Sequence, residues 1–182
     1  MYHGSNPTAL QSQQWIVDSL IILMEEKPYQ QITIMDICRK ADLSRQTFYN
    51  VFDLKEDVLR FCLQSEYRQQ FHSVKDHDVL TIEDVVNALA AVLQKNDKLL
   101  SLMIHNNLDA ILADEIAKCV SLFADRFVKD PQEIAQLPYA KALLNGALAH
   151  LLVYWFRQET PISLEELTHL IADFLEGKLF AL

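Results

Sequence analysis

The sequence predicts an all-α protein. Of its 182 residues only 3 are glycine and 5 are proline, while 51% are hydrophobic. Along most of the chain the apolar residues recur three and four positions apart, which is the spacing of one face of an α-helix. Polar capping residues precede several of these stretches. Together these observations predict about nine helices, arranged as a three-helix N-terminal group followed by a larger helical body.

The first helix is expected over residues 8–26, after a loose arm at residues 1–7. Its apolar residues recur three to five positions apart, with some drift around the helix. Lys27-Pro28 should end it, because a residue that precedes proline avoids the helical backbone conformation.

Residues 33–55 are predicted to form two short helices joined by a tight turn. Thr33 is a candidate N-cap, and Asp36 follows three residues later, where its carboxylate can face the unpaired amides. Asp42-Leu43 provides the turn. Ser44 then caps the second helix, because its hydroxyl can accept a hydrogen bond from the backbone amide two or three residues further on. This arrangement predicts a helix-turn-helix.

The second short helix has an apolar face and a polar face. Phe48 and Phe52 are four residues apart and should pack back on the first short helix. The residues left facing outward are Arg45, Gln46, Thr47, Tyr49 and Asn50. Arginine can form a paired hydrogen bond with guanine and glutamine with adenine, whereas hydroxyl and ammonium groups suit phosphate oxygens. The pattern favours DNA binding, and an ordinary helical hairpin with a polar face is the alternative.

A longer pattern extends over the same stretch. It reads Thr33-Ile34-x-x-Ile37-x-x-x-Ala41-x-Leu43-Ser44-x-x-Thr47-Phe48-Tyr49-x-x-Phe52-x-x-Lys55-x-x-Val58-Leu59. This pattern resembles the DNA-binding domain of the TetR family of bacterial transcriptional regulators, and with the preceding helix it covers about a third of the chain. The run Arg45-Gln46-Thr47-Phe48-Tyr49 is similar to a branch that includes the dihydroxyacetone kinase operon activators. The resemblance implies DNA contacts from Thr33, Ser44, Arg45, Gln46, Thr47, Tyr49, Asn50 and Lys55.

The resemblance also implies a division into two domains. Residues 1–54 would form the three-helix helix-turn-helix DNA-binding domain, and residues 55–182 a helical ligand-binding and dimerisation domain. A fourth helix is expected from residue 55 to residue 71 or 72. Lys55 stands where the family has a phosphate-contacting lysine. In the family this helix carries rearrangements of the body to the DNA-binding domain.

The body is expected to contain five further helices. They cover residues 81–94, 98–105, 108–128, 137–158 and 163–177. Asn96-Asp97 should separate the first of these from the second, and Asp130-Pro131 should end the third. Ser163 and Glu166 form a capping box that starts the last helix.

The last two helices carry apolar residues on more than one side, so each needs more than one packing partner. One side can meet the body and the other a second copy of the chain, as the resemblance implies; a monomer core is the alternative. The candidate dimer residues are Leu144, Leu148, Leu151, Leu152, Trp155, Leu167, Ile171 and Phe174. A two-fold homodimer would recognise a near-palindromic double-stranded operator.

Aromatic and polar residues of the body suit a small-molecule site, which the family often encloses between its fourth and eighth helices. The candidates are Tyr67, Met103, His105, Phe123, Phe127, Tyr139, Asn145, His150 and Tyr154. Each has an alternative role, because aromatic residues at helical spacing usually form the core and isolated histidines usually form local hydrogen bonds.

The formal net charge is −9, and most of it lies in the second part of the chain. Residues 1–60 carry 6 basic and 8 acidic side chains, a balance of −2, whereas residues 61–182 carry 10 and 17, a balance of −7. The basic residues around the expected DNA face are Arg39, Lys40, Arg45 and Lys55. Their local field can favour phosphate. The first basic residue of the sequence is Lys27, so the basic N-terminal arm of many relatives is missing.

A cytoplasmic location is expected. No apolar run approaches the ~20 residues that cross a bilayer, and the N-terminus lacks the basic region and hydrophobic core of a signal peptide. Cys38, Cys62 and Cys119 have no Cys-x-x-Cys spacing. An odd, dispersed set of cysteines fits reduced thiols better than a disulfide framework.

The sequence offers no convincing catalytic set. It has no glycine-rich phosphate loop and no Gly-x-Ser-x-Gly segment. Adjacent acidic pairs such as Glu25-Glu26 point apart on a helix, and His72 and His77 have a poor spacing for shared metal binding. We therefore expect no enzyme activity, no metal and no cofactor.

Two classes of function remain. The first is a TetR-like DNA-binding regulator, a ligand-responsive repressor that binds its operator as a dimer. The second is a helical dimer that acts mainly through protein–protein contacts as a co-activator or adaptor, which the acidic body and the missing basic arm favour. Salt dependence discriminates between them, because a protein that neutralises DNA phosphates loses affinity steeply as salt rises.

Overall fold

The computed structural model describes residues 6–74, 81–124 and 131–179. These residues form eight α-helices and one short 3-10 helix, and no strand is found among them. The all-α prediction is therefore confirmed. The chain divides into two compact units, unit 1 at residues 1–63 and unit 2 at residues 64–182.

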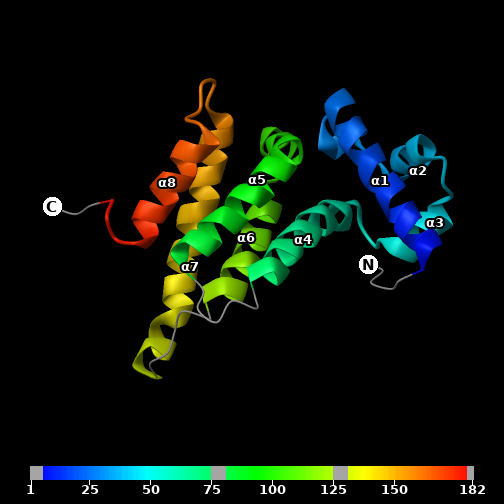
Figure 1. Ribbon diagram of the computed structural model, residues 1–182. Helices are drawn as coiled ribbons and strands as arrows, with labels where there is room; N and C mark the ends of the chain where they lie inside the picture. The colour runs from blue at the N-terminus through cyan, green and yellow to red at the C-terminus, as the bar shows by residue number, and fades with distance from the viewer. Residues whose placement is uncertain (1–5, 75–80, 125–130, 180–182) are drawn as a thin grey trace. The chain divides into compact units, whose positions relative to one another are not determined.

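Unit 1 contains three helices and the start of a fourth. They are α1 (Pro7–Glu26), the 3-10 helix η1 (Tyr29–Gln31), α2 (Ile34–Ala41), α3 (Arg45–Val51) and the first turns of α4 (Lys55–Val74). α1 packs against both α2 and α3, and α2 packs against α3 (Figure 1). The centre of this unit consists of side chains with no exposed surface, namely Ile16, Leu20, Ile37, Phe48 and Phe52.

The start of α4 is attached to unit 1. The ring of Phe61 lies edge-on to the ring of Phe52, with centroids 5.6 Å apart. Val58 and Leu59, on the same two turns, are buried. These contacts place the division of the chain after Leu63, whereas the sequence suggested a boundary between residues 54 and 55. α4 thus begins in one unit and ends in the other.

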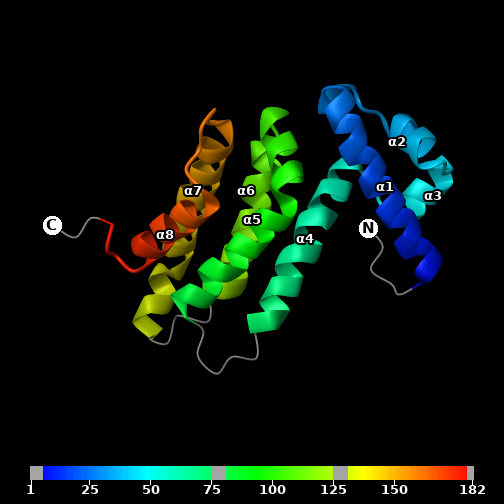
Figure 2. The ribbon, with the colours of Figure 1, turned by 45° about the horizontal axis from the view of Figure 1, so that its top comes forward.

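Unit 2 contains the end of α4 and four further helices. They are α5 (Ile82–His105), α6 (Asp109–Ala124), α7 (Pro131–Arg157) and α8 (Leu164–Leu175). α5 packs against α6, α7 and α8, and α6 packs against α7 (Figure 2). α5 is therefore the central helix of this unit, because it contacts each of the three helices that follow it.

The expected break at Asn96-Asp97 is wrong. α5 runs without interruption through both residues. Asn96 is buried, and its side-chain amide donates to the backbone carbonyl of Val92 one turn earlier, at 2.8 Å. Because the polar group is satisfied within the helix, it does not end the helix. Two expected helices become one, so the described residues hold eight α-helices rather than nine.

The expected start of the following helix at residue 137 is also wrong, because α7 begins at Pro131. Proline suits the first position of a helix, where its missing amide hydrogen would have no partner. The capping predictions are confirmed: Ser163 and Glu166 form a capping box at the start of α8. An equivalent box of Thr81 and Asp84 starts α5.

Candidate nucleic-acid interface and ligand cavity

The turn between α2 and α3 has the tight geometry of a helix-turn-helix. Asp42 caps the C-terminus of α2, and its backbone is left-handed with φ 54° and ψ 43°. The amide of Leu43 donates to the carbonyl of Cys38 at 2.9 Å, which closes the end of the helix. Ser44 Oγ then accepts from the amide of Thr47 at 3.0 Å and begins α3. Both caps lie where the sequence predicted them.

The two faces of α3 differ sharply in burial. Phe48 is fully buried and Val51 nearly so, which fixes the helix against the rest of unit 1. The exposed residues of the opposite face are Arg45, Gln46, Tyr49 and Asn50, while Thr47 is half-buried. Gln46 Nε2 donates to Asn50 Oδ1 at 3.1 Å. The outward orientation is thus as expected, and the contact of these residues with DNA stays a prediction.

The hydroxyl groups assigned to DNA also cap helices. Thr33 Oγ1 donates to the carboxylate of Asp36 at 2.8 Å and accepts from the Asp36 amide at 3.1 Å. The hydroxyls of Ser44 and Thr47 lie 2.8 Å apart and share a hydrogen bond. These groups therefore hold the starts of α2 and α3 in place.

Lys55 has partners inside unit 1 that the sequence did not reveal. Its Nζ donates to the backbone carbonyls of Tyr29 and Ile32, both at 2.9 Å, and lies 4.1 Å from the centroid of the Tyr29 ring. Burial and the nearby Glu56 raise the pKa of the Tyr29 hydroxyl above its ordinary value. Lys55 therefore links the first turn of α4 to the segment between α1 and α2.

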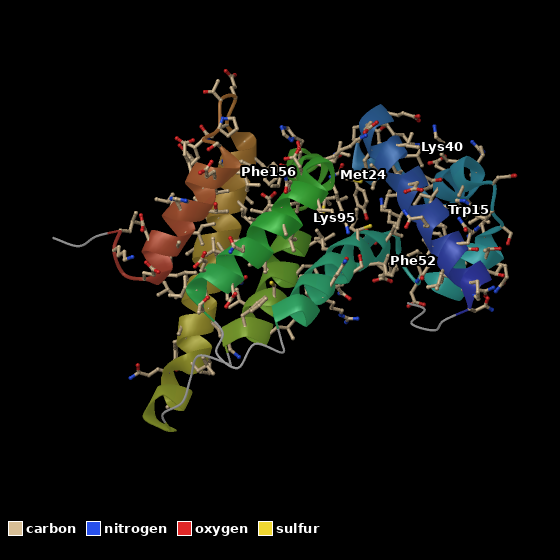
Figure 3. The ribbon with its side chains drawn as sticks, viewed as in Figure 1. Trp15, Met24, Lys40, Phe52, Lys95 and Phe156 are labelled. Atoms are coloured by element: carbon tan, nitrogen blue, oxygen red, sulfur yellow. The ribbon has the colours of Figure 1, made fainter. Side chains whose placement is uncertain are left out.

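Two other lysines of unit 1 form ion pairs. Lys40, labelled in Figure 3, binds Glu26 at 2.7 Å, and Lys27 binds Asp36 at 2.8 Å. The hydrogen bonds from Lys27 and from Thr33 hold the pKa of the Asp36 carboxyl well below its usual range. Of the four cations expected to attract phosphate, Lys40 and Lys55 thus have partners within the unit, while Arg39 and Arg45 are exposed. Arg39 and Arg45 are therefore the most accessible of these cations, while Lys55, which bonds to uncharged carbonyls, keeps its positive charge.

Unit 2 contains a cavity of about 390 Å³ that is partly open to solvent. Its walls come from every helix of the unit, including the end of α4. The lining residues are Tyr67, Ile82, Val85, Val86, Ala88, Leu89, Val92, Cys119, Val120, Phe123, Leu137, Ala140, Leu144, Leu148, Ile171 and Leu175. A cavity of this size falls within the range of small-molecule sites, roughly 300–1,000 Å³.

The lining residues that carry a polar side-chain atom are Tyr67 and Cys119. The Tyr67 hydroxyl lies 3.4 Å from Glu115 Oε2, and Glu115 Oε1 accepts from Lys118 Nζ at 2.5 Å. Burial raises the pKa of Tyr67 to about 12 and that of Cys119 to about 11. At neutral pH the thiol is therefore protonated, and a protonated thiol is a poor nucleophile and a poor metal ligand.

The structure separates the sequence-based ligand candidates. Tyr67 and Phe123 line the cavity. Met103 is fully buried but outside the lining, and Tyr139 and Tyr154 are 79% and 60% exposed. The remaining candidates also lie outside the lining; they are His105 and His150, which are exposed, and Asn145, which is half-buried. Phe127 falls outside the described residues.

His105 forms a local hydrogen bond, which is the alternative role expected for an isolated histidine. The ring nitrogen Nδ1 of His105 lies 2.7 Å from the carbonyl of Ser101 one turn earlier. The residues that sequence reasoning missed are the aliphatic ones of the wall, such as Val85, Leu89 and Val92. Their helical spacing is the same as that of core residues, so no sequence signal distinguished them.

The candidate dimer residues also divide. Leu152, Leu167 and Ile171 are at most 2% exposed within the single chain, and Leu144, Leu148 and Ile171 line the cavity. The half-buried members are Leu144, Leu148, Leu151, Trp155 and Phe174. Trp155 Nε1 donates to the carbonyl of Ile162 at 2.7 Å, and its ring lies edge-on to that of Phe156. Three of the eight candidates are therefore buried within unit 2, and the role of the other five in a dimer stays a prediction.

A different apolar face of α7 is exposed. Tyr139, Leu143 and Tyr154 are 79%, 71% and 60% exposed. Gly146 and His150 lie between Leu143 and Tyr154 and are exposed as well. Successive members of this set of five are three or four residues apart. Residues at this spacing share one side of a helix. This α7 stripe, defined by these five residues, is a candidate surface for a second copy.

No helix in the described part of the chain has the length and apolar character needed to cross a membrane. Within the same residues, no group of three or more histidine, cysteine, aspartate or glutamate side chains is arranged to hold a metal ion.

Comparisons with known proteins give partial sequence matches. No family model matches the sequence. The chain is 30% identical over 66 residues to the HTH-type dhaKLM operon transcriptional activator DhaS of Lactococcus lactis, which is 36% of this chain and 35% of that protein. It is 32% identical over 103 residues to the transposon Tn10 TetC protein of Escherichia coli, which is 57% of this chain and 50% of that protein. The chain thus spans half or less of the length of these curated relatives.

Comparisons with solved structures cover nearly the whole chain. The protein Lin0861 of Listeria innocua superposes with a TM-score of 0.73 at 17% identity, covering 97% of this chain and 96% of that one. A TetR-family transcriptional regulator of Syntrophomonas wolfei superposes with a TM-score of 0.65 at 18% identity, covering 94% and 96%. The chain therefore has the all-α fold found in TetR-family transcriptional regulators.

Proposed function

We propose that this chain is a TetR-type DNA-binding transcriptional regulator, a repressor that binds a near-palindromic operator as a homodimer and responds to a small molecule in unit 2. The observation that carries the proposal is the geometry of α3. One face of this helix is fixed by the buried Phe48, and the other presents Arg45, Gln46 and Asn50 to solvent. The described residues of the chain provide no comparable support for the protein-contact alternative.

The chemistry of the exposed face suits the edges of DNA bases. The Arg45 guanidinium can donate two hydrogen bonds to O6 and N7 of guanine, and the Gln46 amide can pair with adenine. In a helix-turn-helix the N-terminal part of the second helix enters the major groove, and Ser44 to Asn50 form that part here. Arg39 can add a phosphate contact from α2, which fixes position rather than sequence.

The α7 stripe supports a homodimer. Large apolar side chains such as Tyr139 and Leu143 are costly to leave in water when they form a continuous face, and such faces commonly mark contact surfaces. A two-fold contact uses the same patch on both copies. The proposed dimer is then tested by Leu143→Glu, with Leu122→Glu on α6 as the matched change of an exposed leucine outside the stripe. Sedimentation should find the first variant monomeric and the second dimeric; two dimers would contradict the stripe.

The response to ligand follows from population shift. A molecule that prefers the conformation with weak DNA affinity lowers operator binding by the ratio of its affinities for the two conformations. The cavity of unit 2 is the proposed place of binding, and we locate the regulator in the cytoplasm because all three of its cysteines are free thiols.

The experiment that tests the proposal selects bound duplexes from a random DNA library and then measures affinity for the selected site over a range of salt. The logarithm of the association constant should fall linearly with the logarithm of the salt concentration, because phosphate contacts release counterions. Arg45→Ala should reduce the preference for the selected site by about 1–3 kcal/mol. Lys98→Ala, on an exposed position of α5, should leave it unchanged. Equal binding to all duplexes, with no effect of Arg45→Ala, would exclude sequence reading by α3.

A further inference from the structure

We infer that the cavity of unit 2 takes an uncharged, hydrocarbon-rich small molecule with at most one hydroxyl or carbonyl group, which lies beside Tyr67. This inference deepens the proposed function, on which it rests for its regulatory meaning, because it names the chemical class of the effector. The binding itself is measurable without DNA, so the two can fail separately.

The shape of the cavity favours a small molecule over a protein segment. Five helices contribute to its wall, from Tyr67 on α4 to Leu175 on α8. A concave wall assembled from five helices can bury much of the surface of a small ligand. A docked helix or loop would instead need an extended groove along one or two elements. The occupant that this concave wall fits is therefore a compact ligand.

The chemistry of the wall excludes charge. Aliphatic and aromatic carbon atoms form nearly all of it, with Val85, Leu89 and Leu144 as typical members. A charged group moved from water into such surroundings without a partner is strongly disfavoured. The Cys119 thiol offers no compensating charge, since burial raises its pKa to about 11 and keeps it neutral. The ligand must therefore be neutral along the length of the cavity.

The Tyr67 hydroxyl supplies a single polar anchor. Its distance of 3.4 Å to Glu115 Oε2 is long for an O–H···O hydrogen bond, whose usual range is about 2.5–3.0 Å. Glu115 is itself held by Lys118, and both Lys118 and Tyr67 border a separate shallow hollow. The Tyr67 oxygen can therefore accept a hydrogen bond from a ligand hydroxyl or turn to donate to a ligand carbonyl. One such group on an otherwise apolar ligand matches the wall.

Isothermal titration of the full-length protein with three ten-carbon compounds tests the class directly. 1-Decanol should bind saturably, one molecule per chain, with a dissociation constant at least tenfold lower than those of decanoate and decylammonium at neutral pH. Equal or tighter binding of either ion would overturn the inference. Absence of saturable decanol binding would also overturn it, and intact operator binding in the same preparation would show that the proposed function survives.

Two variants place the ligand in the cavity. Ala140→Phe adds a ring to an α7 position that lines the cavity and is exposed on its helix, so folding should be preserved. It should weaken decanol binding at least tenfold, whereas Ala110→Phe, at an exposed alanine of α6 outside the lining, should not. Both variants should bind operator normally without ligand. Equal effects of the two variants on decanol binding would place the ligand elsewhere.

The polar anchor has its own variant. Tyr67→Phe keeps the ring and removes the hydroxyl. It should therefore weaken the binding of 1-decanol several-fold and leave the binding of decane unchanged. If both ligands lose affinity equally, the hydroxyl has no anchoring role and the ring only shapes the wall.

Discussion

Helix α3 of unit 1 and the cavity of unit 2 are built from contacts that span very different distances along the sequence. α3 is set by a cap from Ser44 to Thr47 and by Phe48, all within one helical turn. The cavity instead needs side chains from Tyr67 to Leu175, carried by five helices. A surface made by one short segment is specified locally, whereas a cavity exists only when distant helices pack. Their responses to substitution should therefore differ in kind.

The largest expected effect is on the packed centre of unit 1. Phe48→Ala removes a ring with no exposed surface and should cost about 3–5 kcal/mol of the free energy of unfolding. Phe123→Ala removes a ring that borders the cavity, so fewer contacts are lost and the cost should be clearly smaller. Urea denaturation followed by circular dichroism measures both. Equal costs would mean that the cavity wall is packed as tightly as the centre of unit 1.

The next effect concerns Lys55, whose two interpretations predict different results. If Lys55 acts as an internal link to the Tyr29 and Ile32 carbonyls, Lys55→Met should lower the free energy of unfolding by roughly 1.5–3 kcal/mol, because hydrogen bonds from a charged donor are lost. The salt dependence of operator binding should stay the same. If Lys55 instead contacts a phosphate, the slope should fall by about one while stability changes little. Lys95→Met, on an exposed position of α5, is the control for loss of a lysine.

The helix caps allow a matched comparison between the units. Ser44 and Ser163 are both N-caps that accept from the amide three residues later, at 3.0 Å and 3.1 Å. Changing either serine to alanine should cost about 1 kcal/mol of stability. Only Ser44→Ala should also weaken operator binding, because it loosens the start of α3. A similar loss of DNA affinity in Ser163→Ala would show that the effect comes from general destabilisation.

The sequence predicted features whose partners lie within one helical turn. Examples are the outward face of α3 and the caps at Thr33, Ser44 and Ser163. Each is defined by one residue and another three or four positions later. Lys55 shows where this reasoning stops. Its partner carbonyls lie 26 and 23 residues earlier, and no spacing rule connects them.

The aliphatic lining of the cavity and the α7 stripe were missed for a related reason. α7 is apolar on several sides, and a helical pattern does not say which side meets the core. Leu144 and Leu148 were therefore assigned to a dimer surface although they line the cavity, while Tyr139 and Tyr154 were assigned to a ligand site although they face solvent. Only the packing of α7 against α5 and α6 decides between these sides.

The smallest expected effect is a difference in the pH dependence of stability between unit 1 and the cavity of unit 2. The folded-state pKa of Asp36 is lowered, chiefly by Lys27, so its contribution to stability is present above the unfolded pKa and is lost as pH falls through the folded one. Asp36→Asn should flatten the acid limb of the stability curve. The pKa of Tyr67 is raised to about 12 from 10.0, so its contribution is complete below pH 10 and is lost as pH rises toward 12. Tyr67→Phe should flatten only the alkaline limb. Thermal melts at stepped pH, followed by the fluorescence of Trp15 in α1 and Trp155 in α7, measure both limbs; a change in the acid limb caused by Tyr67→Phe would contradict this separation.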